Sequence, residues 1–144
     1  MELEISRSVI AGVLAQAAAS PGVEVCGLLV GDGRVDAYQA CANVAERPAD
    51  SFEIDPRALI AAYRAERAGG RAIVGCYHSH PSGDAMPSVR DAQAAEANGW
   101  IWLIVAGGEA KAFRAVEGGA LHDMFDPVEL RMTRHRLQHR QPFA

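Results

Sequence analysis

The spacing of apolar residues along the chain predicts three helices and six strands. From about Arg7 to Ala19 they recur every three or four residues, as on the buried face of a helix, and Pro21–Gly22 ends this segment. A second helix begins at Asp55–Pro56, where an aspartate can cap the first turn, and a third covers about Ser88 to Asn98. Short apolar runs bounded by turn residues predict strands over residues 3–5, 24–30, 35–41, 72–80, 100–105 and 111–116.

Strands mixed with helices of this length indicate an α/β fold. We predict a curved mixed β-sheet flanked by helices. No internal repeat, linker or low-complexity tract divides the chain, so we expect a single domain over residues 1–144.

The end of the chain is rich in basic side chains, which predicts a basic helical tail over about residues 128–144. The helix itself is expected over about Arg131–Arg140. Most basic runs are solvated helix faces or frayed tails. The alternative is that this one docks to an acidic carrier protein.

Composition and charge exclude several classes of protein. The chain has 144 residues, 49% of them hydrophobic and 22% charged, as in ordinary globular domains, and its formal net charge of −4 argues against nucleic-acid binding. No apolar run approaches the roughly 20 residues of a membrane span, and Met1–Ile5 lacks the basic start of a signal peptide. Three scattered cysteines fit reduced thiols in the core: Cys26, Cys41 and Cys76. We therefore expect a cytoplasmic protein that binds neither membranes nor nucleic acids.

A pair of histidines followed by an aspartate is the strongest chemical pattern. His78 and His80 stand two positions apart at the end of a predicted strand, so both side chains point to one face. Asp91, about one turn into the next helix, can add a carboxylate oxygen. Two histidines, one carboxylate and an open fourth position are typical of a catalytic zinc site, where the pKa of a bound water falls toward about 7. We expect one Zn²⁺ per chain.

Such a site needs a base, and Glu24, a lone charge at the head of an apolar strand, is the candidate. Each residue also has a structural interpretation. Glu24 could be a solvated strand-end charge, and His78–His80 could belong to a polar loop. Ser88 and Asp91 could form a capping box at the start of the third helix.

The combination resembles the JAMM motif of the MPN+ metallopeptidases. The spacing His-x-His-x7-Ser-x2-Asp, with Glu-x-Cys-Gly-Leu-Leu-x-Gly upstream, is matched without substitution. The resemblance implies a cytidine-deaminase-like MPN fold with zinc held by His78, His80 and Asp91. It further implies that Glu24 is the general base for the zinc-bound water and that Ser88 donates a hydrogen bond to the oxyanion.

The resemblance also covers Ser51–Pro56 and Trp100–Val105, and thus most of the chain. It implies hydrolysis of an amide or isopeptide bond after the C-terminal glycine of a ubiquitin-like or sulfur-carrier protein. A Gly-Gly tail can lie as an added strand beside a sheet edge. The chain has no room for long insertions, so it is similar to the compact prokaryotic members. Its oligomeric state stays open.

Three alternatives from other classes compete with this interpretation. A non-catalytic MPN-type binding scaffold would be expected to have lost Glu24 or a metal ligand. A mononuclear iron oxygenase also uses two histidines and a carboxylate, but its usual His-x-Asp/Glu…His order is absent. A zinc nucleoside deaminase would need a Pro-Cys-x-x-Cys segment, which the sequence lacks.

Overall fold

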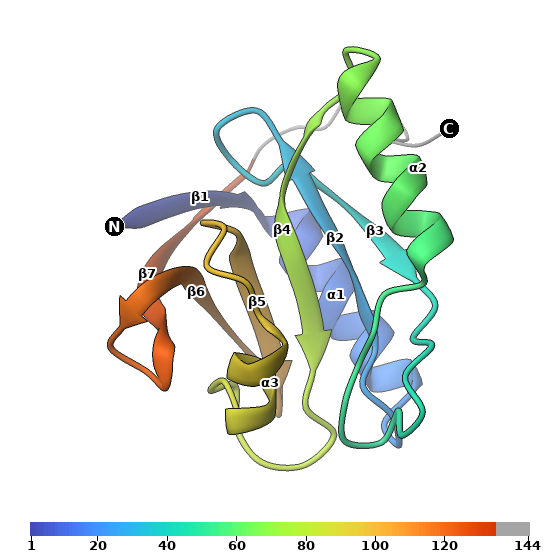
Figure 1. The fold of residues 1–144 in the computed structure, drawn as a ribbon, viewed down its shortest axis with the longest axis vertical. Helices are drawn as coiled ribbons and strands as arrows, with labels where there is room; N and C mark the ends of the chain where they lie inside the picture. The colour runs from blue at the N-terminus through green and yellow to red at the C-terminus, as the bar shows by residue number, and fades with distance from the viewer. Residues whose placement is uncertain (135–144) are drawn as a thin grey trace.

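One seven-stranded sheet forms the centre of the computed structural model, which describes residues 1–134 (Figure 1). In chain order the elements are β1 (Glu2–Ser6), α1 (Arg7–Ala19), β2 (Cys26–Gly31), β3 (Ala37–Cys41), α2 (Pro56–Arg67), β4 (Ala72–Ser79), α3 (Val89–Ala94), β5 (Ile101–Ala106), β6 (Glu109–Gly119) and β7 (Asp123–Thr133). The strand order is β1-β7-β6-β5-β4-β2-β3. The pairs β1–β7 and β4–β5 are parallel and the others antiparallel. The predicted curved, mixed sheet flanked by helices is confirmed.

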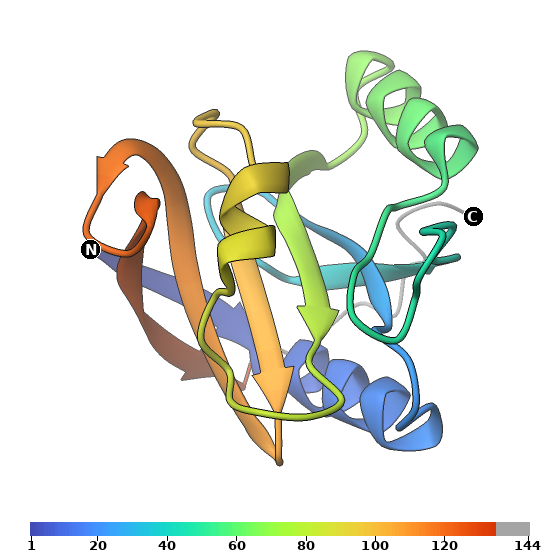
Figure 2. The ribbon, with the colours of Figure 1, turned by 60° about the horizontal axis from the view of Figure 1, so that its bottom comes forward.

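Helices cover both faces of this sheet, and each face has its own hydrophobic core (Figures 1 and 2). On one face α1 buries its apolar stripe, as its spacing predicted, against the central strands. The stripe is Val9, Ile10 and Val13, and its partners include Tyr77, Leu103 and Val105. The opposite face, which carries α2 and α3, is built around Cys76, Trp102, Ile104, Phe113 and Phe125.

Local sequence explains why the helices and strands form where they do. The Asp55 carboxylate accepts a hydrogen bond from the backbone N–H of Arg57 at 3.0 Å, and Pro56 occupies the first position of α2, as predicted. In β2, a Cβ at Gly27 would lie 2.4 Å from the ring of Tyr77. Glycine at this position therefore lets the Tyr77 ring cross β2 on the α1 side.

The structure corrects the sequence prediction at the C-terminal end. Residues 123–133 form β7, a strand that the apolar pattern did not predict, and residues 131–133 are extended rather than helical. Along β7, Phe125 and Val128 are buried in the two different hydrophobic cores, while Asp126 and Glu129 are exposed. Pairing with β6 on one side and β1 on the other holds this stretch extended up to and beyond Arg131, its single basic residue. The rest of the predicted basic tail, and any docking role for it, lies outside the described residues, so the single domain over residues 1–144 stays a prediction.

Two smaller expectations also change. The third helix ends at Ala94 rather than near Asn98, because Ala95 is already extended and Gly99 follows at φ +79°. All three cysteines are free, as expected; Cys26 and Cys76 are buried, whereas Cys41 is only half-buried. Within residues 1–134, no helix combines the length and apolarity that crossing a membrane requires.

Candidate metal centre

The two histidines of the motif lie side by side where β4 ends, at the lower edge of the sheet in Figure 1. His78 is the penultimate residue of β4 and completely buried, and His80 follows the strand half-buried. Their Nε2 atoms are 3.1 Å apart. The strand alternation that predicted a shared face is confirmed.

Asp91 reaches both histidines from the first turn of α3. Its Oδ1 lies 3.1 Å from His78 Nε2, and its Oδ2 lies 3.1 Å from His80 Nε2. A capping box holds this carboxylate in place. The backbone N–H of Ser88 donates to Asp91 Oδ2 at 3.0 Å, and the N–H of Asp91 donates to Ser88 Oγ at 2.9 Å. The capping box and the cluster of ligand atoms therefore coexist, and the cap orients the carboxylate toward the histidines.

The donor set fits a divalent metal ion. His80 Nδ1 donates to the carbonyl oxygen of Asp84 at 2.8 Å, so Nε2 faces the cluster and, once it has lost its hydrogen, can offer its lone pair to a metal ion. The separations of 3.1 Å are close to the edge of a zinc tetrahedron, about 3.3 Å for Zn–N bonds of about 2.0–2.1 Å. Within residues 1–134, His78, His80 and Asp91 are the only three such side chains with ligand atoms within 4.8 Å of one another.

Glu24 is buried beside this cluster rather than solvated. It lies two residues before β2, and pairing of Cys26 with His78 sets the start of β2 against the end of β4. The Glu24 side chain is 5% exposed, and its Oε1 has no hydrogen-bond partner among the described residues. A buried carboxylate oxygen without a partner is costly, so the solvated strand-end interpretation is wrong.

Ser79, between the two histidines, ties the segment before β2 to the end of β4. Its Oγ accepts a hydrogen bond from the backbone N–H of Val25 at 2.9 Å, and its own N–H donates to the Val25 carbonyl at 3.0 Å. These bonds fix the backbone next to Glu24 relative to the backbone between the two histidines.

Asn43, which the sequence analysis missed, connects the segment after β3 to the site. Its Nδ2 donates to the carbonyl oxygens of Glu24 at 2.9 Å and Ser51 at 3.0 Å. Its Oδ1 accepts from the backbone N–H groups of Ala45 and Glu53, both at 3.0 Å. Three of these four hydrogen bonds, all but the one to Ala45, join Asn43 to residues eight or more positions away in sequence. In the sequence, an asparagine just after a predicted strand indicates only a turn, and nothing there predicts this hydrogen-bond network.

Replacing Asn43 by alanine is expected to lower the free energy of unfolding by about 2–3 kcal/mol, because two carbonyls and two N–H groups lose their partner. Urea unfolding of the metal-free protein measures this loss. Asn98→Ala is the control, since Asn98 Oδ1 accepts one exposed hydrogen bond from Trp100 N–H. Equal losses in the two variants would contradict the network role.

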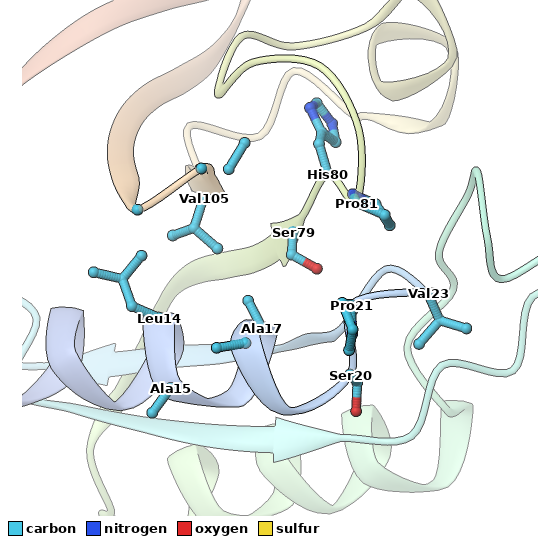
Figure 3. A pocket seen from close by; sticks show the side chains of 14 residues that line it. Leu14, Ala15, Ala17, Ser20, Pro21, Val23, Ser79, His80, Pro81 and Val105 are labelled. Carbon is cyan, nitrogen blue, oxygen red and sulfur yellow. The ribbon is translucent and has the colours of Figure 1, made fainter.

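Two grooves lie on opposite faces of the sheet, and His80 lines one of them. One lies between the C-terminal half of α1 and the ends of β4 and β5, with Ser79, His80 and Pro81 along one side (Figure 3). The other lies between α2 and α3, and aromatic side chains contribute much of its lining: Phe52, Tyr63, Trp100 and Trp102.

Burial and mutual contact set the charges of the cluster. Burial opposes ionisation of Asp91, but hydrogen bonds from His78 and His80 outweigh it and hold the pKa of this carboxyl well below its usual range. Burial lowers the pKa of His78. Burial also acts to lower the pKa of His80, but contacts with Asp91 and the Asp84 carbonyl outweigh burial and raise it. An anionic carboxylate beside a neutral His78 is the state that binds a cation.

The family of this chain follows from its similarity to known proteins. The chain matches Prok-JAB, the prokaryotic homologs of the JAB domain, over residues 6–117. It belongs to this family. The resemblance to compact prokaryotic JAMM proteins is thereby confirmed.

Similar proteins include a desampylase and a conjugate-cleaving protease. The desampylase, from Haloferax volcanii, is 40% identical over 91 residues, 61% of this chain and 66% of the relative. A probable TtuB-protein conjugate cleaving protease from Thermus thermophilus is 34% identical over 96 residues, 66% of this chain and 64% of the relative. The matched part of the chain thus spans just under two thirds of the length of each relative.

The fold of this JAB-domain protein is also found in a solved structure. A protein from Desulfitobacterium hafniense superposes with a TM-score of 0.78 at 28% identity, covering 96% of this chain and 97% of that chain. The two chains therefore share this fold over nearly their whole length.

In the metal-free JAB-domain protein, Glu24 is expected to weaken the fold as the pH rises. Burial, reinforced by the charge of Asp91, raises the pKa of this carboxyl from 4.5 to about 7. Between these values the folded state holds a proton that the unfolded state has released. The unfolding free energy therefore falls as the pH rises through this window.

Denaturant unfolding from pH 4 to 8, with Glu24→Gln as the reference, isolates this contribution from those of the histidines. The stability of the wild type relative to the variant should fall by up to about 3 kcal/mol between pH 4.5 and pH 7. If the difference in unfolding free energy between wild type and Glu24→Gln does not change with pH, the pKa of Glu24 is not raised.

Proposed function

We propose that this protein is a zinc metallopeptidase that hydrolyses an amide or isopeptide bond after the C-terminal glycine of a ubiquitin-like or sulfur-carrier protein. The observation that carries the proposal is the convergence of His78 Nε2, His80 Nε2 and the Asp91 carboxylate beside the buried, unpartnered Glu24. Three ligands and an adjacent base suit hydrolysis, whereas a structural zinc site would have four protein ligands.

The names of the two relatives support the class of substrate. One is a desampylase, and the other is named for cleaving TtuB-protein conjugates. Both names describe removal of a protein from a conjugate. A carrier whose tail ends in Gly-Gly is the partner that we propose for this chain, because residues without side chains can enter a narrow site in extended form.

Zn²⁺ bound by His78, His80 and Asp91 would lower the pKa of a water molecule and polarise the scissile carbonyl. Glu24 would then act as the general base: Oε1, which has no hydrogen-bond partner within residues 1–134, takes the proton of the attacking water and returns it to the leaving amine. In the metal-free protein burial raises the pKa of this carboxyl to about 7, and a cation bound beside it would lower that pKa and favour the ionised base.

Ser88 would stabilise the negative charge that develops on the carbonyl oxygen. Its Oγ accepts the hydrogen bond of the capping box from Asp91 N–H, which leaves the hydroxyl hydrogen free to donate. The cap thus fixes the donor in position before the substrate arrives. The groove that His80 lines would hold an extended chain on one side of the scissile bond.

Metal analysis of the purified protein, followed by an assay on conjugates of a Gly-Gly-tailed carrier, tests the proposal. About one zinc per chain, chelator-sensitive cleavage and recovery on adding zinc are expected. Bound zinc without cleavage of any carrier conjugate would instead favour the non-catalytic binding scaffold. Failure to bind zinc at all would remove the metal centre.

A further inference from the structure

The two histidine rings of the metal centre are held in different ways. His80 Nδ1 donates to the carbonyl oxygen of Asp84 at 2.8 Å, which fixes its ring plane. His78 Nδ1 is buried and has no hydrogen-bond partner among the described residues. Metal-binding histidines almost always use this second nitrogen in a hydrogen bond that orients the ring. Apart from the contact of Nε2 with Asp91, the His78 ring therefore depends on packing for its orientation.

Aromatic packing holds the His78 ring instead. Phe52 stacks on it, with ring centroids 4.3 Å apart and ring planes only 21° from parallel. The ring of Trp102 is nearly perpendicular to that of His78, with centroids 5.7 Å apart and an interplanar angle of 87°. Trp102 also contacts Phe52 edge-on, with ring centroids 5.6 Å apart. Phe52 and Trp102 together form a slot that fixes both the position and the tilt of the imidazole.

Phe52 is itself fixed by its backbone. Asn43 hydrogen-bonds to both neighbours of Phe52, through its Nδ2 to the carbonyl of Ser51 and through its Oδ1 to the N–H of Glu53, each at 3.0 Å. The segment after β3 thus brings a rigidly held ring onto a histidine of β4. The Phe52 side chain can neither form a hydrogen bond nor carry a charge. What it contributes is therefore the flat face of its ring, stacked on His78.

We propose that Phe52 is a positioning residue that sets the ring plane of His78 and thereby the affinity for zinc. Phe52 does so in place of the hydrogen bond that His78 Nδ1 lacks. The inference rests on the proposed function, since it assumes that His78 binds the metal. Without the ring of Phe52, His78 can rotate about its Cβ–Cγ bond, and binding must restrict that rotation.

Competition with a chromophoric chelator measures the zinc dissociation constant in the absence of substrate. Phe52→Leu, which keeps a large apolar side chain without a flat face, is expected to weaken zinc binding by about 10–100-fold, the usual cost of losing the group that orients a ligand. Phe52→Tyr, which keeps the ring, should restore affinity to near the wild-type value. Thermal unfolding of the metal-free variants shows that each is folded.

Phe113→Leu is the matched control for the loss of a buried aromatic ring. Phe113 belongs to the hydrophobic core against which Phe52 also packs, and it is 2% exposed. Its ring centroid lies 6.3 Å from that of Phe125. This variant should lose stability and keep its zinc affinity. If Phe52→Leu does not fold, Phe52→Met provides the same test, because methionine adapts to irregular core space.

The outcomes separate this inference from the proposed function. Wild-type affinity in Phe52→Leu, with zinc bound normally by the wild type, would overturn the role of Phe52 alone. An equal loss in Phe113→Leu would also overturn it, because general destabilisation would then explain the effect. Absence of zinc binding in the wild type would overturn both proposals.

Discussion

Replacing Glu24 by glutamine is expected to lower the rate of conjugate cleavage by about 10²–10⁴-fold while zinc remains bound. Glutamine fills nearly the same space but cannot take a proton from water. Because Glu24 is not among the three side chains whose ligand atoms converge, the metal should stay. Steady-state kinetics together with metal analysis of the same preparation measure both quantities.

Glu46→Gln is the control for this experiment, since Glu46 is an exposed glutamate on the segment after β3. It should leave both the rate and the zinc content unchanged. A Glu24→Gln protein that holds zinc and cleaves conjugates at the wild-type rate would contradict the assignment of Glu24 as the general base.

Asp91→Ala is expected to abolish zinc binding at micromolar metal and with it all activity. The Asp91 carboxylate is the anionic member of the cluster and lies 3.1 Å from a nitrogen of each histidine. Its loss also removes half of the capping box, because the backbone N–H of Ser88 loses its acceptor. We therefore expect an additional loss of stability of about 1 kcal/mol in the metal-free protein, measured by urea unfolding.

Two further variants separate these effects. Asp91→Asn keeps an oxygen for Ser88 N–H, so it should retain most of the cap but lose the charge and most of the zinc affinity. Asp50→Ala removes an exposed acid near the site that pairs with Arg90 at 3.1 Å, and it should change neither property by much. Stoichiometric zinc in Asp91→Ala would contradict the ligand assignment.

The sequence by itself determined most of the elements and the ligand cluster. Helical spacing located α1, and Asp55–Pro56 marked the start of α2, because caps and apolar stripes are local properties of the chain. The alternation of side chains along a strand placed His78 and His80 on one face without any knowledge of the fold. The motif spacing then singled out Asp91, which the structure brings within 3.1 Å of both histidines.

Only the tertiary structure decided how the site is held together. The capping box and the ligand cluster were competing interpretations of Ser88 and Asp91, but the geometry of a single carboxylate accommodates both. The burial of Glu24 follows from how β2 and the segment after β3 pack around it, and neither its neighbours in sequence nor its charge could show this.

Long-range partners account for the remaining differences. β7 forms because β6 and β1 offer it hydrogen-bonding edges on both sides, although the basic run that begins at Arg131 suggested a helix. Asn43 and Phe52 act across gaps in sequence, on Glu24 and His78 respectively. An isolated asparagine or phenylalanine has no periodicity and no motif, because its role depends on which residues folding brings next to it.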